Sequence, residues 1–380
     1  MNYLTCLEGV TDFEETKKIL ISKNLIVKHD DSEPIFLVKY DKSKCDMDDQ
    51  DVRRCRGLIL EKGTNNLVCV PPPHSEKADL FNQIDINETV FEEFVDGTMI
   101  NVFKYKGELY MSTRSCIGAY CKYYSNKTFN ALFSEIIDLS QFSVIGDNMN
   151  ITFILQHPEN IIVTKYTQPS ITLVYGVTVT DNTVQHHSLG ELRDMLKEKS
   201  LEFNIPETYK LDHPTKVYEV INKMDQNSQG LILKCYKDNG TVYLRAKIRN
   251  EHYNYVRQLK GNSNNKKYLY LDLRKKRLLD QYLKYFSEDS DLFEIYKMEL
   301  YDTTNNLFNF YQDYYVRRNE DGKRLINFTD IKFEYRPLCI ELHNDFKMTK
   351  KVTDKRKIIN YMNNLPTAKL LFVINYKYRK

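Results

Sequence analysis

Five basic residues recur within short motifs along the first two thirds of the chain: Arg56, Lys77, Arg114, Arg245 and Lys247. A guanidinium group forms paired hydrogen bonds with phosphate oxygens, and an ammonium group adds a compact positive charge. These side-chain types therefore predict a site for a phosphorylated ligand, provided that the fold brings them together. Surface charges that pair with nearby acids are the alternative interpretation.

The motifs that carry these residues follow one another in a fixed order. Arg56-Gly57 comes first, and Asp96-Gly97-Thr98 lies between two strand-like segments. No single motif is specific, because an Arg-Gly or Asp-Gly pair occurs by chance in many chains. The other members, in chain order, are Glu76-Lys77 with Phe81-Asn82, Ser112-Thr113-Arg114-Ser115, His157-Pro158-Glu159-Asn160, Gln229-Gly230-Leu231 and Leu244-Arg245-Ala246-Lys247.

In this order and at this spacing, the motifs over residues 35–250 resemble the nucleotidyltransferase domain of the phage-type RNA ligase family, which repairs nicked tRNA. The resemblance implies an α+β fold. A nucleotidyltransferase (ATP-grasp-like ligase) domain with antiparallel sheets would span 1–250, followed by a mainly helical C-terminal domain over 251–380. The resemblance also implies a nucleotide- or phosphate-binding site made of Arg56, Lys77, Asp96, Gly97, Arg114, Gln229, Arg245 and Lys247.

Hydrophobic periodicity agrees with this division. Short apolar or alternating runs predict strands before residue 250, and apolar residues recur at helical spacing after residue 252. An Asn- and Lys-rich break at 261–267 lies near the change, so we place the domain boundary close to it. The predicted strands lie at 34–40, 57–60, 67–70, 99–103, 108–111, 151–155, 171–175, 231–233 and 242–244, and two predicted helices lie at 13–20 and 189–197.

Three positions depart from the family pattern. In RNA ligases, DNA ligases and mRNA capping enzymes, the lysine of a Lys-x-Asp-Gly motif attacks the α-phosphate of a nucleotide. Here Phe94 stands at that position, and a phenyl ring has no lone pair to attack with. The third-motif glutamate falls on Ile154, with Gln156 the nearest polar substitute, and the fourth-motif glutamate is Gln229. With Phe94 in place of the lysine, we predict no catalytic residue. Because Mg²⁺ favours carboxylate ligands, we also predict no metal site.

Other candidates for a nucleophile are weak. Lys104 and Lys106 lie on the following hairpin, eight and ten residues beyond Asp96. At a strand rise of about 3.3 Å per residue, both lie far from the motif along the chain. His157 precedes Pro158, and the chain shows no recognisable hydrolase motif, so we expect His157 to be structural.

Charge and composition limit the possible partners and cellular location of the protein. The net charge of +3 is small, but residues 347–380 contain ten Lys or Arg and one acid, Asp354. This basic segment is a candidate contact for an RNA backbone, with a solvated basic face as the alternative. The chain has no apolar run that approaches the roughly 18 residues of a membrane span, no signal peptide pattern and no Cys-x-x-Cys pair. We expect an intracellular, cytoplasmic protein without a membrane partner.

Three hypotheses follow. The leading one is a catalytically degenerate RNA-ligase-like protein that binds RNA or nucleotide phosphate in an RNA-processing or transcription assembly, with RNA and other proteins as partners. The second is an active ATP-dependent RNA ligase, for which alone ATP and Mg²⁺ would be cofactors. The third is a scaffold for protein interaction. A basic cleft around Arg56, Lys77 and Lys247 favours the first; a lysine with a carboxylate pair favours the second; a cleft filled by Phe94 and Ile154 favours the third.

Overall fold

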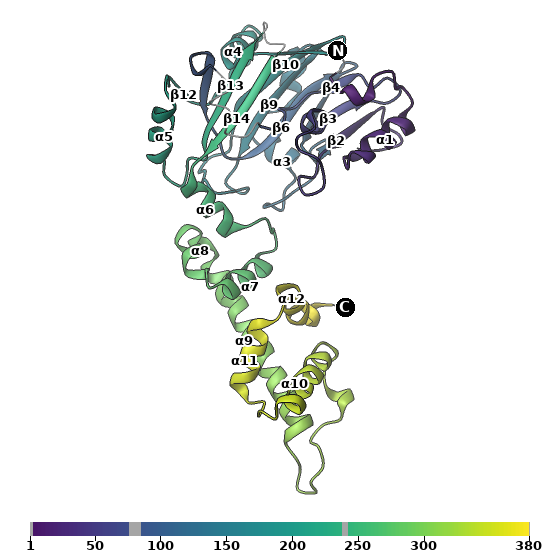
Figure 1. Ribbon diagram of the computed structural model, residues 1–380, viewed down its shortest axis with the longest axis vertical. Coiled ribbons are helices and arrows are strands. Elements are labelled where there is room, and N and C mark those ends of the chain that lie inside the picture. Colours follow the sequence, from purple (N-terminus) through teal and green to yellow (C-terminus); the bar gives the residue numbers. More distant parts are fainter. Residues whose placement is uncertain (1–2, 76–84, 238–241, 380) are drawn as a thin grey trace. The chain divides into compact units, whose positions relative to one another are not determined.

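The structure is a computed structural model that describes residues 3–75, 85–237 and 242–379 (Figure 1). Two compact units make up the chain, Met1–Tyr255 and Val256–Lys380. The first unit contains antiparallel sheets with a few helices, and the second is helical. This arrangement confirms the fold class expected from the sequence.

In the described residues, the first unit contains three sheets, and their named strands pair in antiparallel fashion. The strand orders are β1-β2-β3-β4, β11-β10-β9-β6-β7-β8 and β12-β5-β13-β14. All nine predicted strands are present within these sheets. Their bounds are β1 Ile26–His29, β2 Ile35–Lys39, β3 Arg56–Glu61, β4 Leu67–Cys69, β5 Thr89–Glu93, β6 Thr98–Tyr105, β7 Glu108–Thr113, β8 Cys116–Ile117, β9 Met149–Gln156, β10 Ser170–Thr180, β11 Thr183–His186, β12 Thr208–Tyr209, β13 Gly230–Lys237 and β14 Val242–Arg249.

The third sheet has two chemically different faces, because side chains alternate along a strand. On one face, apolar residues pack against α5 (Pro214–Asn222). On the other face, Lys234 of β13 lies opposite Arg245 of β14, and Ile232 lies opposite Lys247. The register therefore directs the basic residues of β14 away from the apolar core. That core consists of Phe91, Val217, Ile221, Leu231, Leu233, Ala246 and Ile248.

Capping side chains define where the helices of this unit begin. Ser188 precedes α4 (Leu189–Lys197), and its Oγ accepts a hydrogen bond from the backbone N–H of Glu191, whose carboxylate accepts one from Ser188 N–H. Asp12 caps α1 (Phe13–Ser22) in a similar way. Both predicted helices are thus confirmed. The other short helices are α2 (Gln50–Arg54) and α3 (Phe129–Ser134).

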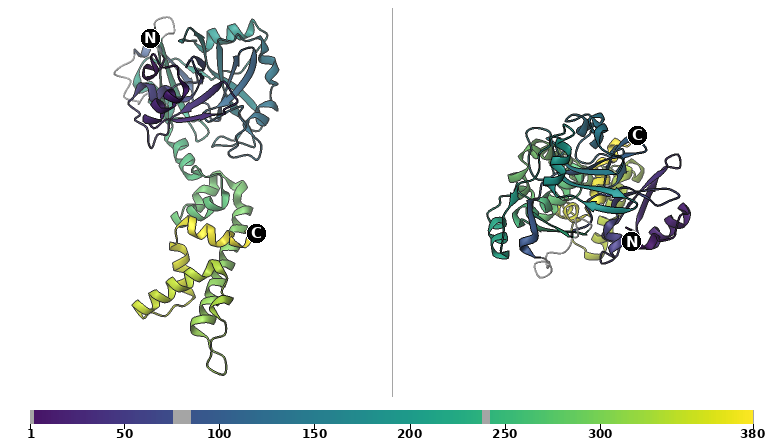
Figure 2. Two further views of the ribbon diagram at one scale, coloured as in Figure 1. Left: turned by 90° about the vertical axis from the view of Figure 1, so that its right-hand side faces the viewer. Right: turned by 90° about the horizontal axis from the view of Figure 1, so that it is seen from above.

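The second unit is a bundle of helices around the long helix α9 (Figure 2). Helix α6 spans the junction between the two units. Of the helices in the described residues, none is both long and apolar enough to cross a membrane. The bounds are α6 Glu251–Lys260, α7 Lys266–Lys276, α8 Leu279–Tyr285, α9 Ser290–Tyr311, α10 Arg336–Thr349, α11 Lys355–Asn364 and α12 Thr367–Asn375.

The basic segment 347–380 is folded in its described part, where it forms the end of α10, then α11 and α12. Several of its cations pair with acids of the same unit: Lys357 with Asp345, Lys369 with Glu341 and Lys377 with Glu299. The remaining charge is concentrated between α10 and α11. Five exposed cations gather there: Lys347, Lys350, Lys351, Lys355 and Arg356.

Candidate phosphate-binding site

Phe94 follows β5 directly, and its backbone N–H donates to the carbonyl oxygen of Gly230 at 2.9 Å. The guanidinium of Arg249 lies 5.6 Å from the centre of the Phe94 ring. Phe94 and Ile154 line the same cavity, which has a volume of about 40 Å³. Such a volume holds about three water molecules. The two apolar replacements thus lie together, at positions where the resemblance implies a lysine and a glutamate.

A buried ion pair lies in the wall of this cavity. The ammonium of Lys234 is 2.6 Å from the carboxylate of Glu92, and each side chain is only 3% exposed. Lys234 also donates to the backbone oxygen of Val174 at 2.7 Å. Burial lowers the pKa of Lys234, and Glu92 opposes that shift. The carboxylate of Glu92 is therefore already matched by a cation and is not free to bind a metal ion.

Asp96 is held in a network of hydrogen bonds. Its carboxylate accepts from the backbone N–H groups of Val163 and Thr164, both at 3.0 Å, and from the hydroxyl of Tyr253 at 2.6 Å. The hydroxyl of Tyr166 donates to the backbone oxygen of Asp96 at 2.8 Å. These contacts give Asp96 the role of connecting the β5–β6 turn to the segment after β9 and to α6.

Two glycines allow chains to approach closely at the site. Gly57 has φ +90°, and a Cβ there would lie 2.8 Å from the Cα of Arg114. Gly97 has φ +149°, and a Cβ there would lie 2.5 Å from the backbone oxygen of Leu155. A side chain at either position would clash with backbone atoms. Gly57 thus brings Arg56 beside Arg114, and Gly97 lets the turn after Phe94 lie against β9.

Five basic side chains from separate elements converge; we call them the cationic cluster. Arg56 comes from β3, Arg114 from the β7–β8 turn, Arg245 and Lys247 from β14, and Lys42 from the loop after β2. Burial lowers the pKa of Arg56 to about 10, and the charges of Arg245 and Arg114 add to this effect. Lys42 is exposed, and partial loss of hydration lowers its pKa, with contributions from the charges of Arg114 and Arg56. The fold therefore brings together four basic residues of the predicted site and adds Lys42.

Lys247 is the most strongly affected member of the cationic cluster. Burial, together with the charges of Arg249, Lys42, Arg245 and Arg56, lowers its pKa to about 7. A lysine ordinarily titrates near pH 10.4. The amine of Lys247 therefore changes charge in the physiological range, unless a bound anion holds its proton.

The partners that orient the cationic cluster are neutral. Arg114 donates from Nη2 to the backbone oxygen of Tyr40 at 2.9 Å and lies over the Tyr40 ring, while its buried Nε has no hydrogen-bond partner. Arg56 donates to the backbone oxygen of Pro72 at 3.2 Å, and Arg245 donates to Oγ of Ser75. Across the described ranges, no carboxylate pairs with any of the five. Excess positive charge of this kind favours an anionic ligand.

His74 adds a neutral polar group beside the cationic cluster. Burial lowers its pKa to about 3, assisted by the charges of Lys42, Lys247, Arg53 and Arg56. Its buried Nε2 has no hydrogen-bond partner in the structure. The imidazole is therefore neutral at physiological pH and offers an unused nitrogen.

Gln229 and Lys77, also predicted for the site, and the two lysines considered as nucleophiles are not among the five basic residues of the cationic cluster. Gln229 is buried, and its backbone oxygen accepts from Asn250 N–H at 3.1 Å. Lys77 and its neighbour Glu76 lie outside the described residues. Lys104 donates to the backbone oxygen of Ser143 at 3.0 Å. Lys106 forms an ion pair of 2.9 Å with Glu61, and its contacts with Tyr105 and Glu61 raise its pKa. Neither lysine is thus placed as a nucleophile.

One group of side chains has the composition of a metal site: Glu135, His157 and Glu159 offer atoms within 4.8 Å of one another. However, the ammonium of Lys127 bridges the two carboxylates at 2.8 and 2.6 Å. His157 uses both ring nitrogens, since Nδ1 accepts from Glu159 N–H and Nε2 lies 3.0 Å from Glu135. Lys127 already supplies the positive charge, which agrees with the structural role expected for His157.

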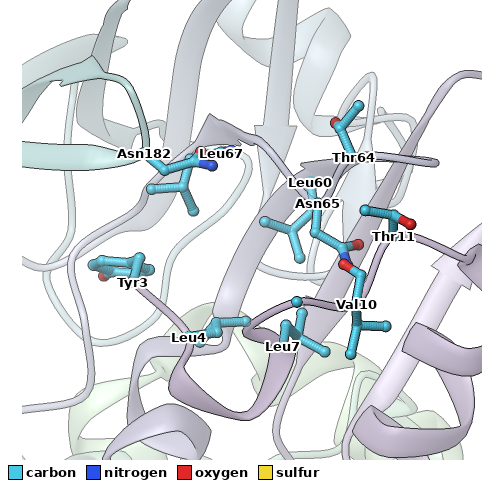
Figure 3. Close-up of a pocket in the computed structure, with 11 residues that line it drawn as sticks. Tyr3, Leu4, Leu7, Val10, Thr11, Leu60, Thr64, Asn65, Leu67 and Asn182 are labelled. Atoms are coloured by element: carbon cyan, nitrogen blue, oxygen red, sulfur yellow. Dashed lines mark hydrogen bonds between the residues drawn. The ribbon is translucent and has the colours of Figure 1, made fainter. Parts of the chain in front are cut away.

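A second cavity, of about 150 Å³, lies beside the short segment η1 (Thr5–Leu7) and the β3–β4 hairpin (Figure 3). Its walls are apolar or neutral, with Leu4, Leu60 and Leu67 around the amide of Asn65. No charged side chain of the described residues lines it. This cavity is therefore unsuited to phosphate.

Sequence reasoning missed three residues of the site: Lys42, His74 and Arg249. Arg249 had a usable signal, because Arg245, Lys247 and Arg249 alternate along one strand and so share one face. Lys42 and His74 lie in loops, where no periodicity marks which way a side chain points. Lys42 follows β2 and His74 follows β4, so tertiary packing places them near the other basic residues of the site.

Comparisons with known proteins give the fold. No family model and no curated protein matches this chain. An archaeal ATP-dependent RNA ligase is similar over 98% of this chain and 97% of its own, with a TM-score of 0.50 and 13% identity. A putative ATP-dependent DNA ligase from Aquifex aeolicus matches over 78% of this chain and 80% of its own, with a TM-score of 0.43 and 15% identity. An RNA ligase from Naegleria gruberi matches over 49% and 58%, with a TM-score of 0.36 and 12% identity.

The likeness to the archaeal RNA ligase extends over nearly the whole length of both chains. At this identity it establishes the architecture, a ligase nucleotidyltransferase fold with a helical C-terminal region. The chemistry of the site depends on the residues that this chain places there.

The titration of Lys247 leads to a prediction. A bound phosphate favours the ammonium form, so above pH 7 binding must take up a proton, and affinity should fall by up to about tenfold per pH unit. Affinity for an RNA with a 5′-hydroxyl, which carries only phosphodiesters, should fall by about twofold from pH 6 to 7, where half of the free amine has lost its proton, and more steeply from pH 7 to 8.5. Lys247→Arg should abolish the decline, because arginine remains charged. A decline that persists unchanged in Lys247→Arg would contradict the assignment.

Proposed function

We propose that this protein is a catalytically degenerate RNA-ligase-like protein that binds RNA through its phosphates. The observation that carries the proposal is the cationic cluster, whose five members have no acidic partner among the described residues. Gathering positive charges that are partly shielded from water and have no acidic partner costs free energy, so a protein that binds no anion would gain stability from losing them. Binding of phosphates accounts for the presence of the cationic cluster. Phe94 stands at the position of the nucleophile, so binding takes place without catalysis.

The alternative of an active ligase requires a nucleophile and carboxylates that organise a metal-bound nucleotide. Lys247 is a lysine at the site with a lowered pKa, but the acids nearby are already engaged. Glu92 pairs with Lys234, and Asp96 accepts from three donors. Ile154 and Gln229 contribute no charge. The proposal therefore needs neither ATP nor Mg²⁺ as a cofactor.

The basic residues between α10 and α11 are a second proposed contact with RNA. Lys355 and Arg356 lie in the first turn of α11, where the helix dipole disfavours cations and one acid, Asp354, caps the helix. Because α11 and α12 pack against α9, deleting this segment would damage the unit. Replacing Lys350 and Lys351 by glutamine tests the contact without that damage.

Salt dependence of RNA binding tests the proposed function. Each phosphate contact with a single strand contributes a slope of about −0.7 to the plot of log affinity against log salt concentration. With a cluster of five cations, we expect a slope steeper than about −2 for a single-stranded RNA, and Arg245→Gln should make the slope shallower by about one contact. Absence of binding at low salt, or binding that ignores salt, would refute RNA recognition through phosphates.

A further inference from the structure

We infer that the cationic cluster takes the 5′-triphosphate end of an RNA in its metal-free form, with arginine and lysine side chains supplying the charge that a divalent cation supplies elsewhere. This inference rests on the proposed function, because it presupposes that RNA binds at the cationic cluster. It adds which part of the RNA is recognised and in which ionic form.

The charge of the cationic cluster favours a triphosphate over a single phosphate. An internal phosphodiester carries one negative charge, and a terminal monophosphate carries about −1.5 to −2 at neutral pH. The cluster gathers five cations, and the largest charge effects on Lys247 all come from other cations. A single phosphodiester would leave most of this repulsion in place. A triphosphate, with several charges on adjacent phosphoryl groups, relieves it.

The spacing of the basic residues also fits a chain of phosphates. Arg245 and Lys247 are two residues apart on one face of β14, about 6.8 Å along the strand, and Arg249 continues the row. A triphosphate chain is of similar length. Arg56 and Arg114 come from β3 and the β7–β8 turn, outside the sheet that contains β14. Cations contributed by separate sheets suit an extended chain of phosphates better than one isolated phosphate.

The carboxylates near the cationic cluster are poorly suited to bind Mg²⁺. Mg²⁺ usually binds phosphates together with one or two protein carboxylates. Glu92 and Asp96 are occupied by Lys234 and by three hydrogen-bond donors. Glu93 is half-buried beside Glu207, and burial raises its pKa. In the ranges that the structure describes, no uncommitted pair of carboxylates accompanies the cluster. Mg²⁺ would therefore compete with the protein for the phosphate oxygens.

Three RNAs of one sequence, with a 5′-triphosphate, a 5′-monophosphate or a 5′-hydroxyl, test the inference by fluorescence anisotropy. In EDTA we expect the triphosphate RNA to bind at least tenfold more tightly than the hydroxyl RNA, with the monophosphate RNA between them. Adding Mg²⁺ in excess should weaken the triphosphate complex several-fold. Inorganic tripolyphosphate should displace the RNA more effectively than orthophosphate.

Matched variants locate the effect. Arg245→Gln with Lys247→Gln should remove most of the preference for the triphosphate, whereas Lys197→Gln with Lys216→Gln, two exposed lysines elsewhere in the unit, should leave it unchanged. Equal binding of all three RNAs would overturn this inference while leaving the proposed function standing. A triphosphate preference that appears only with Mg²⁺ would also overturn it. Failure of every RNA to bind would refute the proposed function itself.

Discussion

Replacing Arg56 and Lys247 together by alanine should weaken RNA binding at low salt by at least about 100-fold. Hydrogen bonds to charged groups contribute about 1.5–3 kcal/mol each, so two such contacts amount to roughly 3–6 kcal/mol. A loss of about 1.4 kcal/mol corresponds to a tenfold change in affinity. The two residues come from different sheets and both lie in the cationic cluster, so the double change removes one cation from each of two sheets. Fluorescence anisotropy with a single-stranded RNA measures the effect.

The control for this variant is Lys197→Ala with Lys216→Ala, which removes the same charge from exposed positions. Its RNA affinity should stay close to that of the wild type. Thermal unfolding gives a second readout: relief of the repulsion between the two cations opposes the loss of the Arg56–Pro72 hydrogen bond, so we expect the double variant to remain folded. RNA affinity within about threefold of the wild type in Arg56→Ala with Lys247→Ala would show that RNA binds elsewhere.

Replacing Asp96 by alanine should lower the free energy of unfolding of the first unit by roughly 3–6 kcal/mol. The carboxylate accepts hydrogen bonds from the N–H groups of Val163 and Thr164 and from the hydroxyl of Tyr253. Each buried donor left without a partner costs about 1–3 kcal/mol. Urea denaturation of the full chain, followed by circular dichroism, measures the change.

Two further variants make the result specific to this network. Asp96→Asn keeps the shape and one acceptor oxygen, so its loss of stability should be smaller than that of Asp96→Ala. Asp194→Ala removes an exposed carboxylate from α4 and should change the free energy of unfolding by less than about 0.5 kcal/mol. If Asp96→Ala unfolds at the same urea concentration as the wild type, the carboxylate does not hold the site together.

The elements of the fold were predictable where their signals are local. Helix α4 has the predicted bounds, and the capping box of Ser188 and Glu191 accounts for its start. The strand run at 231–233 marks β13, and the change to helical spacing after residue 252 marks the helices of the second unit. Alternation along β14 also explains why Arg245 and Lys247, predicted from motifs, share a face.

Contacts between residues far apart in the chain could not be predicted from the sequence. Nothing in the pattern around Asp96 indicates that Tyr253, from α6, would donate to its carboxylate. The pair between Glu92 and Lys234 was missed for the same reason, since the two strands that hold them are adjacent in the sheet but far apart in sequence. Three-dimensional packing, rather than local propensity, decides which charges are paired inside the protein and which remain for a ligand.

The most direct test of the central claim is the intact mass of the protein after incubation with ATP or GTP and Mg²⁺ or Mn²⁺. Phe94 offers no nucleophile, and the acids near it are paired or replaced by neutral residues, so we predict an unchanged mass. Phe94→Lys alone should also remain unmodified, because attack on a phosphate requires alignment and charge neutralisation as well as an amine. A mass increase equal to one nucleoside monophosphate in the wild type, lost in Lys247→Arg, would instead identify Lys247 as a displaced nucleophile and contradict the account.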